Sequence, residues 1–365
     1  MRAIIRVDAS RNIGTGHVMR CLTLAEALKG QGAHVEFICR AHVGNLITRI
    51  EQGGFKVHRL PNLIVRTVKA DNMQERGVIY GEYWLGSTQE QDSTQCLPIL
   101  EDIKPDLLIV DHYSLNYVWQ SALAGGFSKL MVIDDLANRV HQCDLLLDQS
   151  CGRKVEDYAG LVPKKSQLML GSKYALLRSE FAEWRDYSLK RRVNPGFKKL
   201  LITMGGVDSN NRTGQLLKIL SNCSLPKDLE VNVVMGSAAI HLKPVKRQAE
   251  LMPYKTNVKV NVSNMAELMA NADWAIGAAG ATTWERCCLG LPSFMVVLAE
   301  NQRENAYQVS ERCAAIVTEM DCIKEAVELF ERKAKKDLLD ISKNAEKITD
   351  GLGVARVIQV IKGTC

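Results

Sequence analysis

The residues best suited to chemistry lie in a glycine-containing turn at residues 12–17. Gly14 and Gly16 allow backbone angles and a close ligand approach that a Cβ atom would prevent. A helix is predicted directly after the turn, and the unpaired N–H groups at its start can hold an anion. His17 falls in the first helical turn, where the helix dipole disfavours imidazolium and leaves a neutral ring able to accept a proton. The turn therefore predicts an anion site with His17 as a catalytic base.

This turn also has structural explanations. Glycine turns precede helices throughout α/β proteins, and a histidine at a helix start is more often a cap or a surface residue. A nicotinamide cofactor fits poorly, because Met19 stands where the third glycine of that fingerprint belongs. The second predicted strand, at residues 34–40, also ends in Arg40, where an acidic residue would be needed for the cofactor's ribose.

A second stretch of small residues, at residues 277–285, is suited to bind a diphosphate. Small side chains remove bulk from a predicted helix entrance whose N–H groups can face phosphate oxygens, and Thr282 and Thr283 can cap that helix. Glu285 has two explanations. It either completes a capping box with Thr282 or accepts hydrogen bonds from vicinal hydroxyls, such as those of a ribose.

The elements around these two stretches repeat a strand–turn–helix pattern. An apolar run at residues 3–7 predicts a buried strand, and residues 18–28 place apolar side chains on one helical face. After a Pro-Gly break that ends at Gly196, the pattern starts again with a strand at residues 200–203 and a glycine turn. These repeats predict an α/β protein with two Rossmann-like, doubly wound domains facing across a cleft. The expected parts are residues 1–193, residues 197–350 and a terminal helix at residues 351–365.

The composition is that of an ordinary globular protein. With 46% hydrophobic and 24% charged residues, the 365-residue chain is long enough for about two domains. The formal charge of +6 is small and includes no long basic block, so we expect no nucleic-acid partner. No apolar run approaches the length of a membrane span and no leader precedes the first strand, so we expect a cytoplasmic protein with no membrane partner. The 11 cysteines include no C-x-x-C pair, which favours a reducing compartment.

A family resemblance rests on a set of motifs that follow one another along nearly the whole chain. These are residues 6–8, 13–17, 20–21, 204–208, 280–288 and 301–302. The chain resembles the UDP-2,4-diacetamido-2,4,6-trideoxy-β-L-altropyranose hydrolases of pseudaminic acid biosynthesis. Its C-terminal half is similar to the lipid II-forming N-acetylglucosaminyltransferases. One departure is Ala279, where many members have a second glycine.

The resemblance implies a GT-B arrangement in which the second domain holds UDP and the first faces the sugar. It also implies an enzyme that hydrolyses the sugar–phosphate linkage to UDP and a free hexose, with no cofactor and no metal. In our hypothesis His17 activates a water, which attacks the anomeric carbon on the face opposite UDP with inversion, and Asp8 orients His17 or the water. The residues expected to bind UDP are Gly14, Gly16, Gly205, Gly206, Gly280, Ala281, Thr282, Thr283, Glu285, Asn301 and Gln302.

The expected sugar contacts come from aromatic and imidazole side chains that could face acetamido and methyl groups. They are Tyr80, Tyr83, His112 and Tyr113. The implied partner is one UDP-diacetamido-trideoxyhexose substrate, the protein is expected to be a monomer, and the resemblance implies a role in flagellin glycosylation.

Three alternatives remain open at this point. A glycosyltransferase would use the same nucleotide-sugar site with an acceptor hydroxyl in place of water. A UDP-releasing 2-epimerase would change the configuration at the second carbon of the sugar. A nucleotide-sugar binding protein would bind UDP without turnover.

Overall fold

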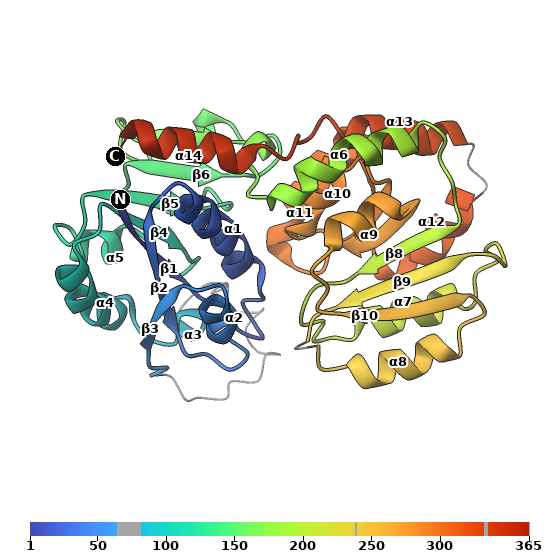
Figure 1. Cartoon of the computed structure of the whole chain (residues 1–365), viewed down its shortest axis with the longest axis horizontal. Helices are drawn as coiled ribbons and strands as arrows, with labels where there is room; N and C mark the ends of the chain where they lie inside the picture. Colours follow the sequence, from blue (N-terminus) through green and yellow to red (C-terminus); the bar gives the residue numbers. More distant parts are fainter. Residues whose placement is uncertain (64–81, 238, 332–334, 365) are drawn as a thin grey trace. The chain divides into compact units, whose positions relative to one another are not determined.

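The structure is a computed structural model that describes residues 1–63, 82–237, 239–331 and 335–364. It divides the chain into two compact units. The first unit contains Met1–Leu176 together with Val354–Cys365, and the second contains Leu177–Gly353. In each unit, a parallel sheet is covered by helices (Figure 1).

The first unit has a seven-stranded sheet in the order β3-β2-β1-β4-β5-β6-β7. Its strands are β1 (Arg2–Val7), β2 (His34–Arg40), β3 (Lys56–Leu60), β4 (Leu107–Asp111), β5 (Lys129–Ile133), β6 (Leu145–Asp148) and β7 (Gln167–Leu170). Its helices are α1 (Gly16–Gly30), α2 (Ile47–Gln52), α3 (Glu82–Leu85), α4 (Gln89–Ile103), α5 (Tyr117–Ala122) and α14 (Gly353–Thr364), with short 3₁₀ helices at Val155–Tyr158 and Ser172–Tyr174.

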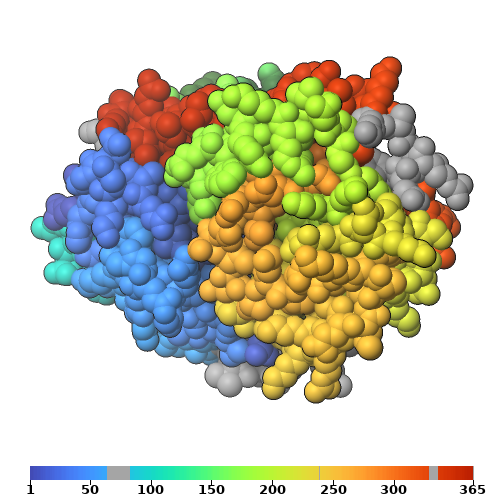
Figure 2. All heavy atoms as spheres, turned by 45° about the vertical axis from the view of Figure 1, so that its right-hand side comes forward, coloured from blue at the N-terminus to red at the C-terminus, as the bar shows by residue number. Residues whose placement is uncertain are grey.

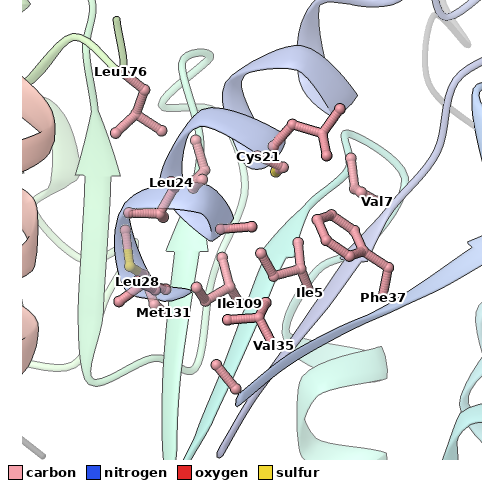
Figure 3. Packing of buried hydrophobic residues seen from close by; sticks show 14 of the residues in the cluster. Ile5, Val7, Cys21, Leu24, Leu28, Val35, Phe37, Ile109, Met131 and Leu176 are labelled. Carbon is pink, nitrogen blue, oxygen red and sulfur yellow. The ribbon is translucent and has the colours of Figure 1, made fainter. Parts of the chain in front are cut away.

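Alternate residues of the central strands pack on opposite faces of this sheet. Ile5, Phe37 and Ile109 lie in one apolar cluster with residues of α1 (Figure 3). Ile4 and Leu108 lie in a second cluster, which includes residues of α4 and α5. Because both faces are buried, the strands read as continuous apolar runs, which is typical of parallel sheets.

The second unit has a six-stranded parallel sheet in the order β10-β9-β8-β11-β12-β13. Its strands are β8 (Lys199–Thr203), β9 (Glu230–Met235), β10 (Lys255–Val260), β11 (Trp274–Ala278), β12 (Ser293–Val296) and β13 (Ile316–Thr318). Its helices are α6 (Ser179–Arg192), α7 (Arg212–Leu220), α8 (Leu242–Glu250), α9 (Met265–Asn271), α10 (Thr282–Cys288), α11 (Arg303–Glu311), α12 (Ile323–Glu331) and α13 (Lys335–Ala345), with 3₁₀ helices at Glu300–Gln302 and Met320–Cys322.

In both sheets the chain adds strands first on one side of the first strand and then on the other side, and this change occurs at the same place in the strand order. In the first unit, strands β2 and β3 follow on one side of β1, and strands β5, β6 and β7 follow on the far side of β4. In the second unit, β8 and β11 take the places of β1 and β4. This is the doubly wound, Rossmann-like pattern, in which ligands bind at the carboxyl ends of the two strands where the order reverses. The predicted repetition of the first half by the second is present in the structure.

The unit boundaries differ from those expected at the Pro-Gly break. Helix α6 was placed with the first domain but belongs to the second unit, where its green atoms lie against orange atoms in Figure 2. The reason is that its polar side chains bind carbonyl groups of that unit. Arg185 donates to Glu346 O at 2.8 Å, and Arg192 donates to Leu289 O at 2.8 Å.

The terminal helix α14 returns to the first unit. Val357 and Ile361 are buried in the apolar cluster that contains α1, and Lys362 donates to Gln31 Oε1 at 2.6 Å. Within the described parts of the chain, no helix combines the length and apolar character needed to span a membrane.

Candidate active site

In the first unit, candidate catalytic side chains meet where β1 and β4 end. These strands are paired so that Val7 lies opposite Asp111. The chain after β1 forms a tight turn, in which Gly14 N donates to Ser10 O at 2.9 Å and Gly14 has a φ of 81°. Since α1 starts directly after this turn, His17 is carried to the carboxyl end of β4.

His17 is held by the carboxylate of Asp111. The His17 Nδ1 atom lies 2.6 Å from Asp111 Oδ1, and the residue is 8% exposed. This contact requires a proton on Nδ1, and in the neutral ring the lone pair is then on Nε2. Among the described residues, Nε2 has no hydrogen-bond partner. The arrangement suits a base that takes a proton through Nε2.

Arg20, one turn further along α1, fixes Asp111 in turn. Its Nε lies 2.6 Å from Asp111 Oδ2 and its Nη2 lies 2.7 Å from Oδ1, while its Nη1 lies 3.0 Å from Asp135 Oδ2. Burial raises the pKa of Asp111, but the charge of Arg20 and the hydrogen bonds from Arg20 and His17 outweigh it and hold the pKa well below its usual range. Asp111 is therefore ionised and oriented for His17.

Tyr113 completes the surroundings of His17. The two rings meet edge to face, with centroids 4.6 Å apart and planes at 86°. On the Tyr113 ring, the guanidinium of Arg139 lies 5.7 Å from the centroid. Tyr113 is only 4% exposed, so its ring mainly restricts the movement of His17.

Of the two roles expected for Asp8, the structure contradicts the orientation of His17, and the orientation of the water stays a prediction. The carboxylate in contact with His17 is Asp111, whereas Asp8 accepts from Arg6 Nη1 and from the Arg40 backbone N–H, both at 2.6 Å. Its second oxygen, Oδ2, lies 3.4 Å from His112 Nε2. Asp8 is fully buried and supports the ends of β1 and β2 instead of orienting the base.

The candidate sugar contacts divide into buried and partly exposed groups. The His112 side chain is 2% exposed, and its Nδ1 accepts from Ser114 N at 3.1 Å. Burial lowers the pKa of His112 to about 3, so the ring is neutral, with its Nε2 atom 3.4 Å from Asp8 Oδ2. Tyr83 is half-buried, and its hydroxyl accepts from Asn12 Nδ2 at 3.1 Å, next to the glycine turn. Tyr80 lies outside the described residues.

In the second unit, glycine-containing stretches follow β8 and β11 at the matching place. The two strands are paired so that Thr203 lies opposite Gly277. After β8, Gly205 has a φ of 102°, a conformation that glycine adopts readily. After β11, residues 279–281 lead into α10. The structure thus places the expected UDP-binding turns of this unit at one edge of one sheet.

The entrance of α10 differs from the expected threonine cap. Its N-cap residue is Ala281, no side chain caps it, and Glu285 makes no capping box. Instead, Thr282 Oγ1 and Thr283 Oγ1 accept from the guanidinium of Arg286, at 3.0 and 3.3 Å. The arginine draws both hydroxyls away from the backbone N–H groups, which is why neither threonine forms the predicted cap.

The Glu285 side chain makes no capping hydrogen bond with the backbone of α10 and is partly buried. Its side chain is 18% exposed, and its Oε1 lies 3.9 Å from Arg178 Nη2. Burial raises the pKa of Glu285 to about 7, although Arg178 and Arg286 act in the opposite direction. A carboxylate so placed gains from hydrogen-bond donors such as ribose hydroxyls.

The loop after β12 reaches the same turn. Gln302 Oε1 accepts from Leu298 N at 2.9 Å, and its Nε2 would lie 3.7 Å from a Cβ atom built on Gly280. Asn301, beside it, is half-buried. Gly280 and Gln302 are therefore neighbours, as the shared sheet edge predicts. The N-terminal residues Gly14 and Gly16 belong to the other unit, and their part in binding UDP stays a prediction.

Comparisons with known proteins fit this geometry. Residues 201–360, most of which belong to the second unit, match the glycosyltransferase family 28 C-terminal domain. The chain is 26% identical to a Campylobacter jejuni protein named UDP-2,4-diacetamido-2,4,6-trideoxy-beta-L-altropyranose hydrolase, over 86% of this chain and 97% of that protein. The family resemblance is confirmed.

Two further likenesses concern length and fold. Over 83% of its own length, the chain is 26% identical to the uncharacterized protein MJ1062 of Methanocaldococcus jannaschii. The match spans 57% of the length of that relative. The crystal structure of Acinetobacter baumannii MurG superposes with a TM-score of 0.68 at 15% identity, covering 99% of both chains. The chain therefore has a GT-B-like fold of two Rossmann-like units. That the units face each other across a cleft stays a prediction.

Sequence reasoning assigned no specific role to three arginine and aspartate positions around His17 and Thr282. Asp111 was visible as a polar residue at the end of a predicted strand, and Arg20 stands three residues after His17 on the same helix. Arg286 lies within the motif at residues 280–288, but its burial was not indicated, because an arginine in a helix is ordinarily a surface residue. In the described parts of the chain, no group of three or more histidine, cysteine, aspartate or glutamate side chains is arranged to hold a metal ion.

Proposed function

We propose that this chain is an enzyme that acts on UDP-sugars, and specifically a nucleotide-sugar hydrolase. The proposed substrate is UDP-2,4-diacetamido-2,4,6-trideoxy-β-L-altropyranose, and the products are UDP and the free hexose. The contact between His17 Nδ1 and Asp111 Oδ1, at 2.6 Å, carries the proposal because it leaves Nε2 as a proton acceptor. The Campylobacter relative, which is matched over 97% of its length, supports the substrate.

The proposed reaction is a single displacement by water. As the water oxygen bonds to the anomeric carbon, its proton passes to His17 Nε2, and Asp111 stabilises the imidazolium that forms. The bond between the anomeric carbon and the β-phosphate oxygen breaks, and UDP leaves with its electron pair. Attack from the face opposite UDP inverts the anomeric carbon. A positioned base of this kind supplies about 10²–10⁴-fold in rate.

We assign UDP binding to the second unit, at the turns after β8 and β11. The backbone at residues 280–283, helped by Gly205 and Gly206, would hold the diphosphate. Glu285 would accept from the ribose hydroxyls, with Asn301 and Gln302 at the same edge. The match of residues 201–360 to a glycosyltransferase C-terminal domain supports this assignment.

Isotope labelling tests the proposal directly. The purified protein is incubated with the UDP-diacetamido-trideoxyhexose in ¹⁸O-water, and the products are followed by mass spectrometry and proton NMR. We expect UDP release without any acceptor, with the label on the anomeric hydroxyl of the free sugar. Label in the phosphate of the nucleotide would show attack at phosphorus and would contradict the role given to His17.

A glycosyltransferase is the second candidate, favoured by the likeness to MurG and by the family 28 domain. It predicts no UDP release until a saccharide or lipid acceptor is added. A 2-epimerase predicts a changed configuration at the second carbon of the sugar, which the same NMR spectra reveal.

A further inference from the structure

We propose that Arg286 is a positioning residue which, acting through Thr282, makes the turn at residues 277–283 a binding site for the diphosphate of a nucleoside diphosphate. This inference rests on the proposed function only in taking UDP as the ligand of the second unit. It assigns a role to a buried side chain that lies within the motif at residues 280–288 but has no part in the expected mechanism.

Arg286 is a buried cation without a carboxylate partner. The residue is 1% exposed, and in the described part of the chain no carboxylate oxygen lies within 4.0 Å of its guanidinium. Its acceptors are Ala278 O at 2.9 Å and the two threonine hydroxyls. Burial lowers the pKa of Arg286 to about 10, which still leaves it charged at neutral pH. A buried charge is costly unless an opposite charge approaches it.

The position of this cation on α10 adds to the cost. The guanidinium reaches back to Thr282 and Thr283 in the first turn of the helix, where the helix dipole is already positive. Arg192 is a useful contrast, because it is also buried and also lacks a carboxylate partner among the described residues. Its guanidinium binds Met269 O, Ala272 O and Leu289 O at the C-terminal ends of α9 and α10, where the dipole is negative. Of these two arginines, Arg286 is the one whose guanidinium lies at the positive end of a helix, where a bound anion would stabilise it.

The threonine hydroxyls can link the charge of Arg286 to a ligand through hydrogen bonds. A hydroxyl oxygen that accepts from Arg286 still has its own hydrogen to donate. Neither hydroxyl donates to any residue that the structure describes. Thr282 is half-buried whereas Thr283 is 1% exposed, so Thr282 is the one able to reach a ligand. A hydroxyl polarised by a guanidinium is a strengthened donor to a phosphate oxygen.

The space around the guanidinium is also adapted to it. A Cβ atom at Gly277 would lie 2.6 Å from Arg286 Nη1 and 2.8 Å from Thr203 Oγ1, so only glycine leaves room for the arginine. Two buried polar atoms there, Arg286 Nε and Thr203 Oγ1, have no hydrogen-bond partner among the described residues. Unsatisfied buried polar groups are rare and call for an explanation, and a bound group that compensates them is one.

Binding of UDP, uridine and inorganic pyrophosphate to the full chain tests the inference by calorimetry. For R286M we expect UDP affinity to fall about 10- to 100-fold, because a charge-assisted contact is lost, with uridine affinity within about two-fold. T282V keeps the shape of the side chain and removes the donor, so UDP affinity should fall about 3- to 10-fold. R286K should recover part of the pyrophosphate binding, since the charge remains but the two-pronged geometry is lost.

R192M is the matched control. It removes an equally buried arginine of the same unit and should lower the melting temperature without changing the ratio of UDP to uridine affinity. If R286M does not fold, as judged by near-UV circular dichroism, T282V carries the test. An unchanged ratio in both T282V and a folded R286M overturns the inference, and so does a wild-type protein that binds UDP no tighter than uridine. A protein that prefers UDP through Arg286 but releases no UDP from any sugar nucleotide would disprove the hydrolase and support this site.

Discussion

The entrances of α1 and α10 contain the same type of residue at the same position and use it differently. Arg20 is the fifth residue of α1 and Arg286 is the fifth residue of α10, and both are buried. Arg20 is neutralised by Asp111 and Asp135, whereas Arg286 meets only a carbonyl and two hydroxyls. A charge-balanced entrance suits proton transfer by a neighbouring histidine. An entrance with a surplus positive charge suits an anion.

The largest expected effect is the loss of turnover when His17, at the entrance of α1, is removed. H17A should lower kcat by about 10²–10⁴-fold, the range supplied by a positioned general base, while UDP affinity stays close to wild type. Steady-state kinetics and UDP calorimetry measure the two effects separately. H34A removes a histidine whose side chain is 67% exposed and serves as the control. Wild-type turnover in H17A would rule out the proposed base.

The two arginines should differ in their effect on stability. R20M leaves the buried carboxylate of Asp111 without its main partner, and we expect the free energy of unfolding to fall by about 3–5 kcal/mol. R286M leaves only neutral acceptors behind, so the expected loss is about 1–3 kcal/mol. Urea denaturation monitored by tryptophan fluorescence compares them. If R20M and R286M lower the free energy of unfolding equally, the proposed contrast between Arg20, which is paired with carboxylates, and Arg286, which is not, is wrong.

Glu285 gives the second entrance a pH dependence between about pH 5 and 7. Its pKa of about 7 in the folded protein lies above its ordinary value of 4.5. Between these values the folded state keeps a proton that the unfolded state has lost, so the free energy of unfolding falls as pH rises from about 5 to 7. The full effect is up to about 3 kcal/mol. E285Q, which cannot ionise, should flatten this slope and weaken UDP binding with little change in kcat at saturating substrate.

Alanine substitutions at the glycines of the two turns should have the smallest effects, and the two turns should differ in how much stability they lose. Gly14 has a φ of 81°, so G14A should lower the free energy of unfolding by about 1–2 kcal/mol through backbone strain. Gly280 is not among the glycines with positive φ, and a Cβ atom there meets only Gln302 Nε2 at 3.7 Å. G280A should therefore change stability by less than about 0.5 kcal/mol. If G280A still weakens UDP binding, the ligand approaches this backbone closely.

The sequence predicted the repeated strand–helix pattern and the two turns at which we propose that ligands bind. Both followed from local information. Apolar runs mark strands that are buried on both faces, and glycine turns follow the strands where the order reverses. The predicted strand at residues 34–40 matches β2 residue for residue. The Pro-Gly break did not mark the unit boundary, because the side chains of α6 bind carbonyls of the second unit.

Only the tertiary structure decided which charges meet. Asp111 is 94 residues from His17 in the sequence, and the pairing of β1 with β4 brings it to the ring in place of Asp8, which is nine residues away. In the same way, nothing in the residues around Arg286 indicates that it is buried without a carboxylate partner. Periodicity and turn residues report on the nearest neighbours along the chain. The partner of a buried charge is set by strand register, which joins distant segments.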